Sequence, residues 1–120
     1  MRYSPLLLDH LEHPRNVGIL ADATHCATSI NAACGDRVDL MLKVVDNLVV
    51  AVAMQAYGCA PTLAAASLLT ELIKDRKLIE LRDLSADSLI EIFQGLPRGK
   101  RHAVDLAIDV LHRTINSPII

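Results

Sequence analysis

The fold is decided by residues 36–55, which read DRVDLMLKVVDNLVVAVAMQ. Every second residue between 38 and 44 is Val or Leu, and this alternation predicts a strand with one buried face. Asp46-Asn47 predicts a two-residue hairpin turn, because both side chains tolerate positive φ. The Val- and Ala-rich stretch 48–55 predicts the returning strand, and its composition indicates cover on both faces.

Outside this hairpin, the sequence predicts one more strand at residues 25–31, which carries Cys26, and several helices. Helix-start signals and apolar residues at helical spacing predict helices that begin near Pro5, Pro61, Ser85 and Lys100. Leu7, Leu8 and Leu11 are expected to form the apolar side of the first helix. The order helix, strands, helices predicts an α+β fold: a small three-stranded antiparallel sheet with helices packed on one face. Residues 1–120 are expected to form a single domain.

Composition narrows the classes of function. About half of the residues are apolar, at 52%, but the chain has no Trp, one Phe and two Tyr, so the core must be aliphatic. The net charge is −2 with mixed signs, which argues against nucleic acid or an anionic membrane as partner. No apolar run approaches a membrane span or a signal-peptide core, so we expect a cytoplasmic protein. Its three cysteines cannot all pair within the chain, and in a reducing compartment they indicate ligands, nucleophiles or buried thiols.

Both ends of the hairpin carry a thiol, and these are the first candidate site residues. Cys34 and Asp36 flank Gly35, and residues i and i+2 of an extended chain share a face, so both side chains could point at one ion. Cys59 precedes Pro61 and therefore lies at a helix N-terminus, where a thiolate is favoured over a thiol. Taken alone, Cys34 and Asp36 are better explained as a buried thiol next to a turn carboxylate, whereas Cys59 could equally be a reactive thiol or a small core residue.

His102 is the only histidine that joins Cys34, Asp36 and Cys59 as a candidate site residue. His102 begins the last helix after a loop with Gly and Pro, although a lone His there is more often a surface or capping residue. The other histidines are expected on a helix surface, in a turn or at a strand edge, and Cys26 in the core. No thiol pair has the close spacing of a strong zinc motif. From the residues alone, a convergent Cys/Cys/Asp/His metal site is plausible. The histidines set aside are His10, His13, His25 and His112.

Several segments taken together resemble one known family. They are Tyr3-Ser4, Asp9-His10, His13-Pro14-Arg15-Asn16-Val17-Gly18, Ala33-Cys34-Gly35-Asp36, Tyr57-Gly58-Cys59 and Leu96-Pro97…Lys100…His102, in that order along nearly the whole chain. This combination is similar to the NifU-like (IscU-type) iron–sulfur cluster assembly scaffolds. The resemblance implies a protein that is not an enzyme: it accepts sulfur from a cysteine desulfurase, holds a transient [2Fe-2S] cluster or zinc, and passes the cluster to acceptor proteins.

The resemblance also implies the ligands. Cys34, Asp36, Cys59 and His102 match the family's cluster- or metal-binding positions, but the family's third cysteine, which follows the His, is here Ala103. Four groups still suffice for a tetrahedral zinc site. Clusters with mixed Cys and His ligation also exist. Fewer thiolates imply a more labile cluster.

The sequence also differs from parts of the family outside the ligand positions. The chain lacks the insertion of the zinc-dependent sulfur-relay branch, and so looks closer to the chaperone-assisted branch. The segment Leu96-Pro97-Arg98-Gly99-Lys100 differs in its middle from that branch's chaperone recognition segment, which makes chaperone docking doubtful. One alternative is a degenerate zinc-binding or metal-free paralogue that acts through contacts with the assembly machinery. Another, less supported, is a small zinc hydrolase with Asp36 as the base.

Overall fold

The computed structural model describes residues 3–97 and 99–119. Arg98, in the middle of the altered Leu-Pro segment, lies outside the described residues, as do the chain ends at 1–2 and 120. The elements follow the order α1 (Pro5–Glu12), β1 (His25–Asn31), β2 (Asp36–Val45), β3 (Leu48–Tyr57), α2 (Ala60–Ile73), α3 (Leu78–Leu81), α4 (Ala86–Ile92) and α5 (Arg101–Ile115). Among the described residues, none of the helices combines the length and the hydropathy that a membrane span requires.

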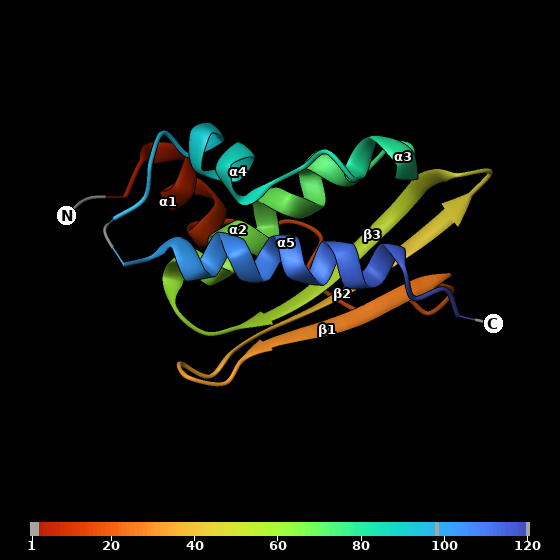
Figure 1. Ribbon diagram of the computed structural model, residues 1–120, viewed down its shortest axis with the longest axis horizontal. Coiled ribbons are helices and arrows are strands. Elements are labelled where there is room, and N and C mark those ends of the chain that lie inside the picture. Colours follow the sequence, from red (N-terminus) through yellow and green to blue (C-terminus); the bar gives the residue numbers. More distant parts are fainter. Residues whose placement is uncertain (1–2, 98, 120) are drawn as a thin grey trace.

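The sheet is three-stranded and antiparallel in the order β1-β2-β3, and the helices gather on one face of it (Figure 1). The α+β prediction is therefore confirmed. The hairpin turn lies at Asp46 and Asn47, with φ of 52° and 64°, as the sequence predicts. Every helix except α3 begins near a start that the sequence predicts. Helix α3 has four residues and is too short to show apolar periodicity.

The core lies between the sheet and the two long helices. Val38, Leu40 and Leu42 turn one face of β2 inward and are at most 1% exposed. α5 packs over β1 and β2, and α2 over β3. The outer edge of β3 is covered in part, because the chain at residues 16–18 hydrogen-bonds to Met54. This arrangement fixes the starts of α2 and α5 near one end of the sheet.

The sequence-based interpretation of α1 is wrong in one respect. Leu8 is 40% exposed, whereas His10, expected on the helix surface, is 1% exposed. Leu7 and His10 are three residues apart and share the face that packs against α2. A polar residue on the buried face cannot be recognised from apolar periodicity alone.

Hydrogen bonds satisfy the buried imidazole of His10. The Ser67 hydroxyl accepts from the Arg15 N–H at 2.9 Å, so its own proton is free for His10 Nδ1, at 2.7 Å. His10 Nε2 then donates to Glu71 Oε1 at 3.2 Å. Arg15 also pairs with Asp9. We call these five residues, Asp9, His10, Arg15, Ser67 and Glu71, the α1 cluster.

Candidate metal centre

The loop between β1 and β2 presents the first two candidate ligands. Gly35 has a φ of +74°, a value that favours glycine, and allows the chain to turn between Cys34 and the start of β2. Cys34 is exposed, and its Sγ lies 3.1 Å from Asp36 Oδ2. Asp36, the first residue of β2, is only 1% exposed, so a buried carboxylate lies beside the accessible thiol of the loop.

The junction of β3 and α2 brings the second thiol to the same carboxylate. Cys59 is the N-cap residue of α2, and its backbone N–H donates to Asp36 Oδ1 at 3.1 Å. Gly58 makes this approach possible: it has a φ of +144°, and a Cβ built there would lie 2.0 Å from Asp36 Oδ1. Only glycine fits at this position.

The first turn of α5 supplies the imidazole. His102 Nε2 lies 3.4 Å from Asp36 Oδ2 and 3.7 Å from Cys59 Sγ. On the other side of the ring, Nδ1 is 3.1 Å from the Gly99 carbonyl oxygen, which can only accept, so Nδ1 carries the proton. The lone pair of a neutral ring then points from Nε2 toward Asp36, which is how histidine is held as a metal ligand.

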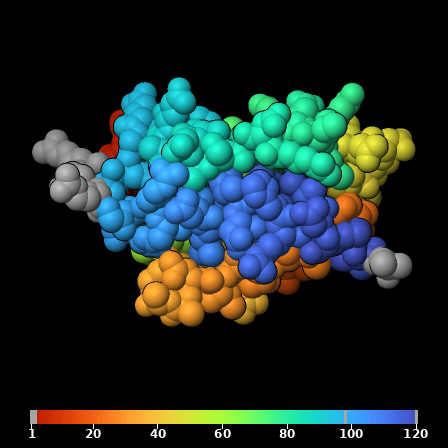
Figure 2. Space-filling model, viewed as in Figure 1, coloured from red at the N-terminus to blue at the C-terminus, as the bar shows by residue number. Residues whose placement is uncertain are grey.

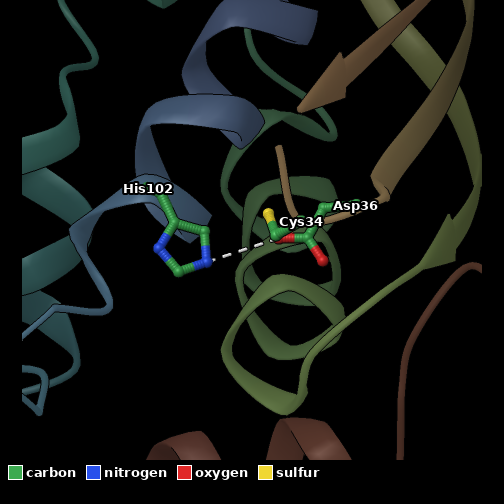
Figure 3. A group of neighbouring side chains, drawn as sticks. All are labelled: Cys34, Asp36 and His102. Atoms are coloured by element: carbon green, nitrogen blue, oxygen red, sulfur yellow. Dashed lines mark hydrogen bonds and ion pairs between the residues drawn. The ribbon is translucent and has the colours of Figure 1, made fainter. Parts of the chain in front are cut away.

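The structure thus brings the four sequence-predicted residues together, and we call Cys34, Asp36, Cys59 and His102 the ligand cluster. Figure 3 shows His102, Cys34 and Asp36 pointing toward one another from α5 and the β1–β2 loop. Their ligand atoms lie within 4.8 Å of one another, and Cys59 Sγ is 3.8 Å from Asp36 Oδ2. Ligands bound at about 2.0–2.3 Å in a tetrahedral zinc site are roughly 3.3–3.8 Å apart. The contacts of Cys59 Sγ with Asp36 Oδ2 and His102 Nε2 have this spacing, but Cys59 is not among the three residues whose ligand atoms all lie within 4.8 Å of one another, so the two thiols must move closer to bind one ion.

The electrostatics of the site centre on Asp36. Burial raises the pKa of its carboxyl, but hydrogen bonds from Cys34, the Cys59 N–H and Thr62, with the nearby imidazole, outweigh burial and lower the pKa. The hydrogen bond to Asp36 and desolvation in turn raise the pKa of the Cys34 thiol. Both oxygens of Asp36 accept hydrogen bonds, which speaks against its use as a base that activates water.

The prediction for Cys26 needs correction. Cys26, expected in the core, is exposed. Ser29 faces α5, and strand alternation therefore turns Cys26 to the opposite, helix-free face of the sheet. It is also five residues along β1 from Asn31, about 17 Å, so it cannot replace the missing thiolate. Ala103, at the position of that thiolate, is fully buried at the start of α5.

Sequence reasoning also missed a residue of the site, Thr62. Its hydroxyl donates to Asp36 Oδ2 at 3.0 Å and contacts Cys59 Sγ at 3.2 Å. An available signal was its place three residues after Cys59, because the side chains of an N-cap residue and the third helical residue are neighbours.

One side of the site opens onto a surface groove. The groove has a volume of about 390 Å³ and runs between the end of β1 and the first half of α5, where His102, Asp105 and Asp109 line it. Figure 2 shows α5, in blue, lying directly above this strand end, in orange. The imidazole therefore borders both the ligand cluster and the groove.

Comparisons with known proteins show the family of the chain. The profile of the NifU-like N terminal domain family matches residues 2–117. Two iron–sulfur cluster assembly scaffold proteins of Archaeoglobus fulgidus are 38% identical over 113 residues, which is 94% of this chain and 74% of theirs. The scaffold protein IscU of Buchnera aphidicola (strain Bp) is 38% identical over 119 residues, covering 96% of this chain and 94% of its own.

Solved structures show the same fold at lower sequence identity. A putative iron–sulfur cluster assembly scaffold protein for the SUF system from Fervidobacterium islandicum superposes with a TM-score of 0.79 at 18% identity, over 94% of this chain and 96% of its own. The N-terminal part of a NifU-like protein from Brucella abortus gives 0.65 at 22% identity, over 94% and 80%.

Proposed function

This chain belongs to the family of NifU-like N terminal domains, and from that membership we propose that it is an iron–sulfur cluster assembly scaffold in the cytoplasm. A cysteine desulfurase supplies sulfur, a [2Fe-2S] unit assembles with iron on the ligand cluster, and acceptor proteins then receive it. The cluster is cargo, and the protein performs no turnover of its own.

The observation that carries this proposal is the convergence of two thiols, an imidazole and a carboxylate at one open end of the sheet. Thiolates suit iron–sulfur units and zinc, and imidazole is an accepted ligand of both. Cys34 is exposed, while Cys59 is partly buried, so Cys34 is the thiol that a sulfur donor reaches first. With two thiolates in place of three, the unit is held less tightly and is released readily.

Anaerobic reconstitution tests the proposal. The protein, ferrous iron, cysteine, a cysteine desulfurase and a thiol reductant are combined; the reductant supplies the electrons that convert the delivered sulfane sulfur to sulfide. Visible absorption follows cluster formation, and an apo-ferredoxin then serves as acceptor. We expect a visible chromophore that moves to the acceptor, and its loss in Cys34→Ser and Cys59→Ser, since each leaves at most one thiolate. A Cys26→Ser variant is the matched control. No chromophore under conditions that load the Archaeoglobus fulgidus relatives would contradict the proposal.

Ala103 favours a second candidate function. Without the third thiolate, the ligand cluster could hold zinc alone, or no metal, and the protein could act by occupying the desulfurase. In that case the purified protein carries one zinc per chain or none, takes up no iron, and still binds the desulfurase in a pull-down. The Asp36→Ala variant separates the two functions: it prolongs the life of a cluster in a working scaffold, but only weakens zinc in a site that has lost assembly.

A further inference from the structure

Thr62 contacts the ligand cluster but is not one of its four members. It is the third residue of α2, counted from Ala60, and its side chain is fully buried. Its methyl group can pack in the core, as many buried threonines do. Its hydroxyl, however, points at the site, where it contacts two of the four members of the ligand cluster, Asp36 and Cys59.

The direction of these hydrogen bonds follows from the chemistry of the partners. The hydroxyl has one proton, and a carboxylate accepts a stronger, charge-assisted hydrogen bond than a sulfur does. Thr62 therefore donates to Asp36 Oδ2, at 3.0 Å. Its hydroxyl oxygen can then accept a hydrogen bond from the thiol of Cys59, whose Sγ lies 3.2 Å away. Asp36 Oδ1 is held separately by the Cys59 N–H. The carboxylate is thus fixed at both oxygens by the first turn of α2.

Metal binding should remove another hydrogen-bond donor from Asp36 Oδ2 and leave the Thr62 hydroxyl in place. Without metal, Cys34 and His102 also lie within reach of Asp36 Oδ2, at 3.1 Å and 3.4 Å. A bound ion takes the Cys34 sulfur as thiolate, so the Cys34 thiol no longer donates to Asp36, and the lone pair of His102 Nε2 binds the ion. Thr62 is then the only side chain of those named that still donates to Oδ2.

We propose that Thr62 is a positioning residue of this site: its hydroxyl holds the Asp36 carboxylate in the orientation that a bound metal ion needs. This inference rests on the proposed function, because it assumes that the ligand cluster binds metal. It extends the site from the four predicted ligands to a buried hydroxyl that orients one of them, as outer partners commonly do in metal sites.

Zinc affinity in a set of threonine variants tests the proposal. Thr62→Val keeps the branched shape and removes the hydroxyl, Thr62→Ser keeps the hydroxyl, and Thr114→Val is the control. Thr114 is also fully buried, but its hydroxyl bonds only to the Val110 carbonyl of its own helix. By competition with a chromophoric chelator, we expect Thr62→Val to weaken zinc about tenfold, Thr62→Ser to restore the affinity, and Thr114→Val to match the wild type.

A double-variant comparison shows whether Thr62 acts through Asp36. If it does, Thr62→Val has no further effect on zinc affinity once Asp36 is replaced by Ala. Cobalt provides a second readout: the absorption bands of Co²⁺-loaded protein shift in Thr62→Val and return in Thr62→Ser. An equal loss of affinity in the wild-type and Asp36→Ala backgrounds would overturn the proposal, as would a failure of serine to rescue.

Hydrogen exchange in the metal-free protein tests the positioning of Asp36 independently of zinc or cluster binding. If the wild-type protein binds no zinc, the ligand cluster is not a zinc site, and the positioning of Asp36 is then judged by hydrogen exchange of the Cys59 amide. That amide donates to Asp36 Oδ1, so it should lose protection when Thr62→Val releases the carboxylate, and keep it in Thr62→Ser. Unchanged protection in Thr62→Val would show that Thr62 does not position Asp36.

Discussion

The ligand cluster and the α1 cluster are two polar groups that both contact α2, and they differ in whether their hydrogen-bonding atoms are already paired. Cys59 of the ligand cluster is the N-cap residue of α2, and Ser67 and Glu71 of the α1 cluster lie on this helix. In the α1 cluster, Ser67 and Glu71 satisfy both nitrogens of the buried His10. In the ligand cluster, His102 Nε2 and two sulfurs converge on one carboxylate, and the thiol of Cys34 is exposed. Hydrogen bonds to both nitrogens of a buried imidazole stabilise a fold, whereas converging donor atoms at an accessible site can bind an ion. The comparison predicts that changes in the two clusters have separable effects.

Gly58→Ala should have the largest effect and should act on the ligand cluster. The new Cβ would lie 2.0 Å from Asp36 Oδ1 at a φ of +144°, so the carboxylate must move. We expect zinc affinity to fall by about a hundredfold and the free energy of unfolding to fall by about 2 kcal/mol. Calorimetric titration and chemical denaturation measure the two quantities.

Gly95→Ala is the matched control for this change. Gly95 also has a left-handed φ, of +101°, but a Cβ there meets nothing within 4 Å. It should lose stability through backbone strain and keep its zinc affinity. Equal zinc affinity in both variants would mean that Asp36 is not a ligand.

His10→Ala should do the opposite, and remove stability without changing metal binding. It leaves Ser67 and Glu71 without their partner and opens a cavity between α1 and α2. We expect the free energy of unfolding to fall by about 2–3 kcal/mol and zinc affinity to remain within error. The exposed neighbour His13 provides the control variant His13→Ala. A loss of zinc affinity in His10→Ala would break the separation between the two clusters.

The α1 cluster should also make stability depend on pH. Burial, followed by the charge of Arg15, lowers the pKa of His10 below 6.5, against the opposing effects of Glu71 and Asp9. The unfolded chain therefore binds this proton at higher pH than the folded protein does. The free energy of unfolding should fall as the pH drops below about 6.5, by up to about 1.4 kcal/mol per pH unit. It should level off below the folded pKa.

Denaturation between pH 7 and 5 checks this dependence, with His10→Gln compared with His13→Gln. The His10 variant should have the shallower slope. The carboxyls whose pKa is lowered act in the same direction but only near pH 3.8 and below; they are Asp9, Asp22, Asp36 and Asp109. Identical slopes in the two variants would show that His10 is not buried as a neutral ring.

The smallest effects should come from Cys26, which belongs to neither cluster. Because it is exposed on the helix-free face, Cys26 should react with an alkylating reagent whether or not zinc is present. Zinc should protect Cys34 and Cys59, and Cys26→Ala should leave metal affinity unchanged. Mass spectrometry of the labelled cysteines distinguishes them. Protection of Cys26 by zinc would place the metal somewhere other than the ligand cluster.

The sheet and the starts of the main helices could be predicted because each depends on local sequence. Alternation fixed the inward face of β2, and Ser4, Pro61 and Ser85 marked helix starts. Position along the chain also suggested which of the thiols lie near the hairpin ends. The buried state of His10 could not be predicted, since it depends on partners 57 residues away on α2. The exposure of Cys26 depends on which face of β1 the helices cover.

The ligand cluster was predicted residue by residue mainly from family resemblance, and its supporting residues were not. Thr62 has no motif of its own, and Gly58 gains its meaning only from the position of Asp36 across the site. Such roles follow from contacts between residues distant in sequence. They become visible only when the loop before β2 and the start of α2 are placed side by side.

The most direct test of the central claim is X-ray absorption at the zinc edge of the zinc-loaded protein. We expect two sulfur ligands at about 2.3 Å and two nitrogen or oxygen ligands at about 2.0–2.1 Å, with one sulfur lost in Cys59→Ser. Zinc bound only by nitrogen and oxygen, or a spectrum unchanged by Cys59→Ser, would contradict it.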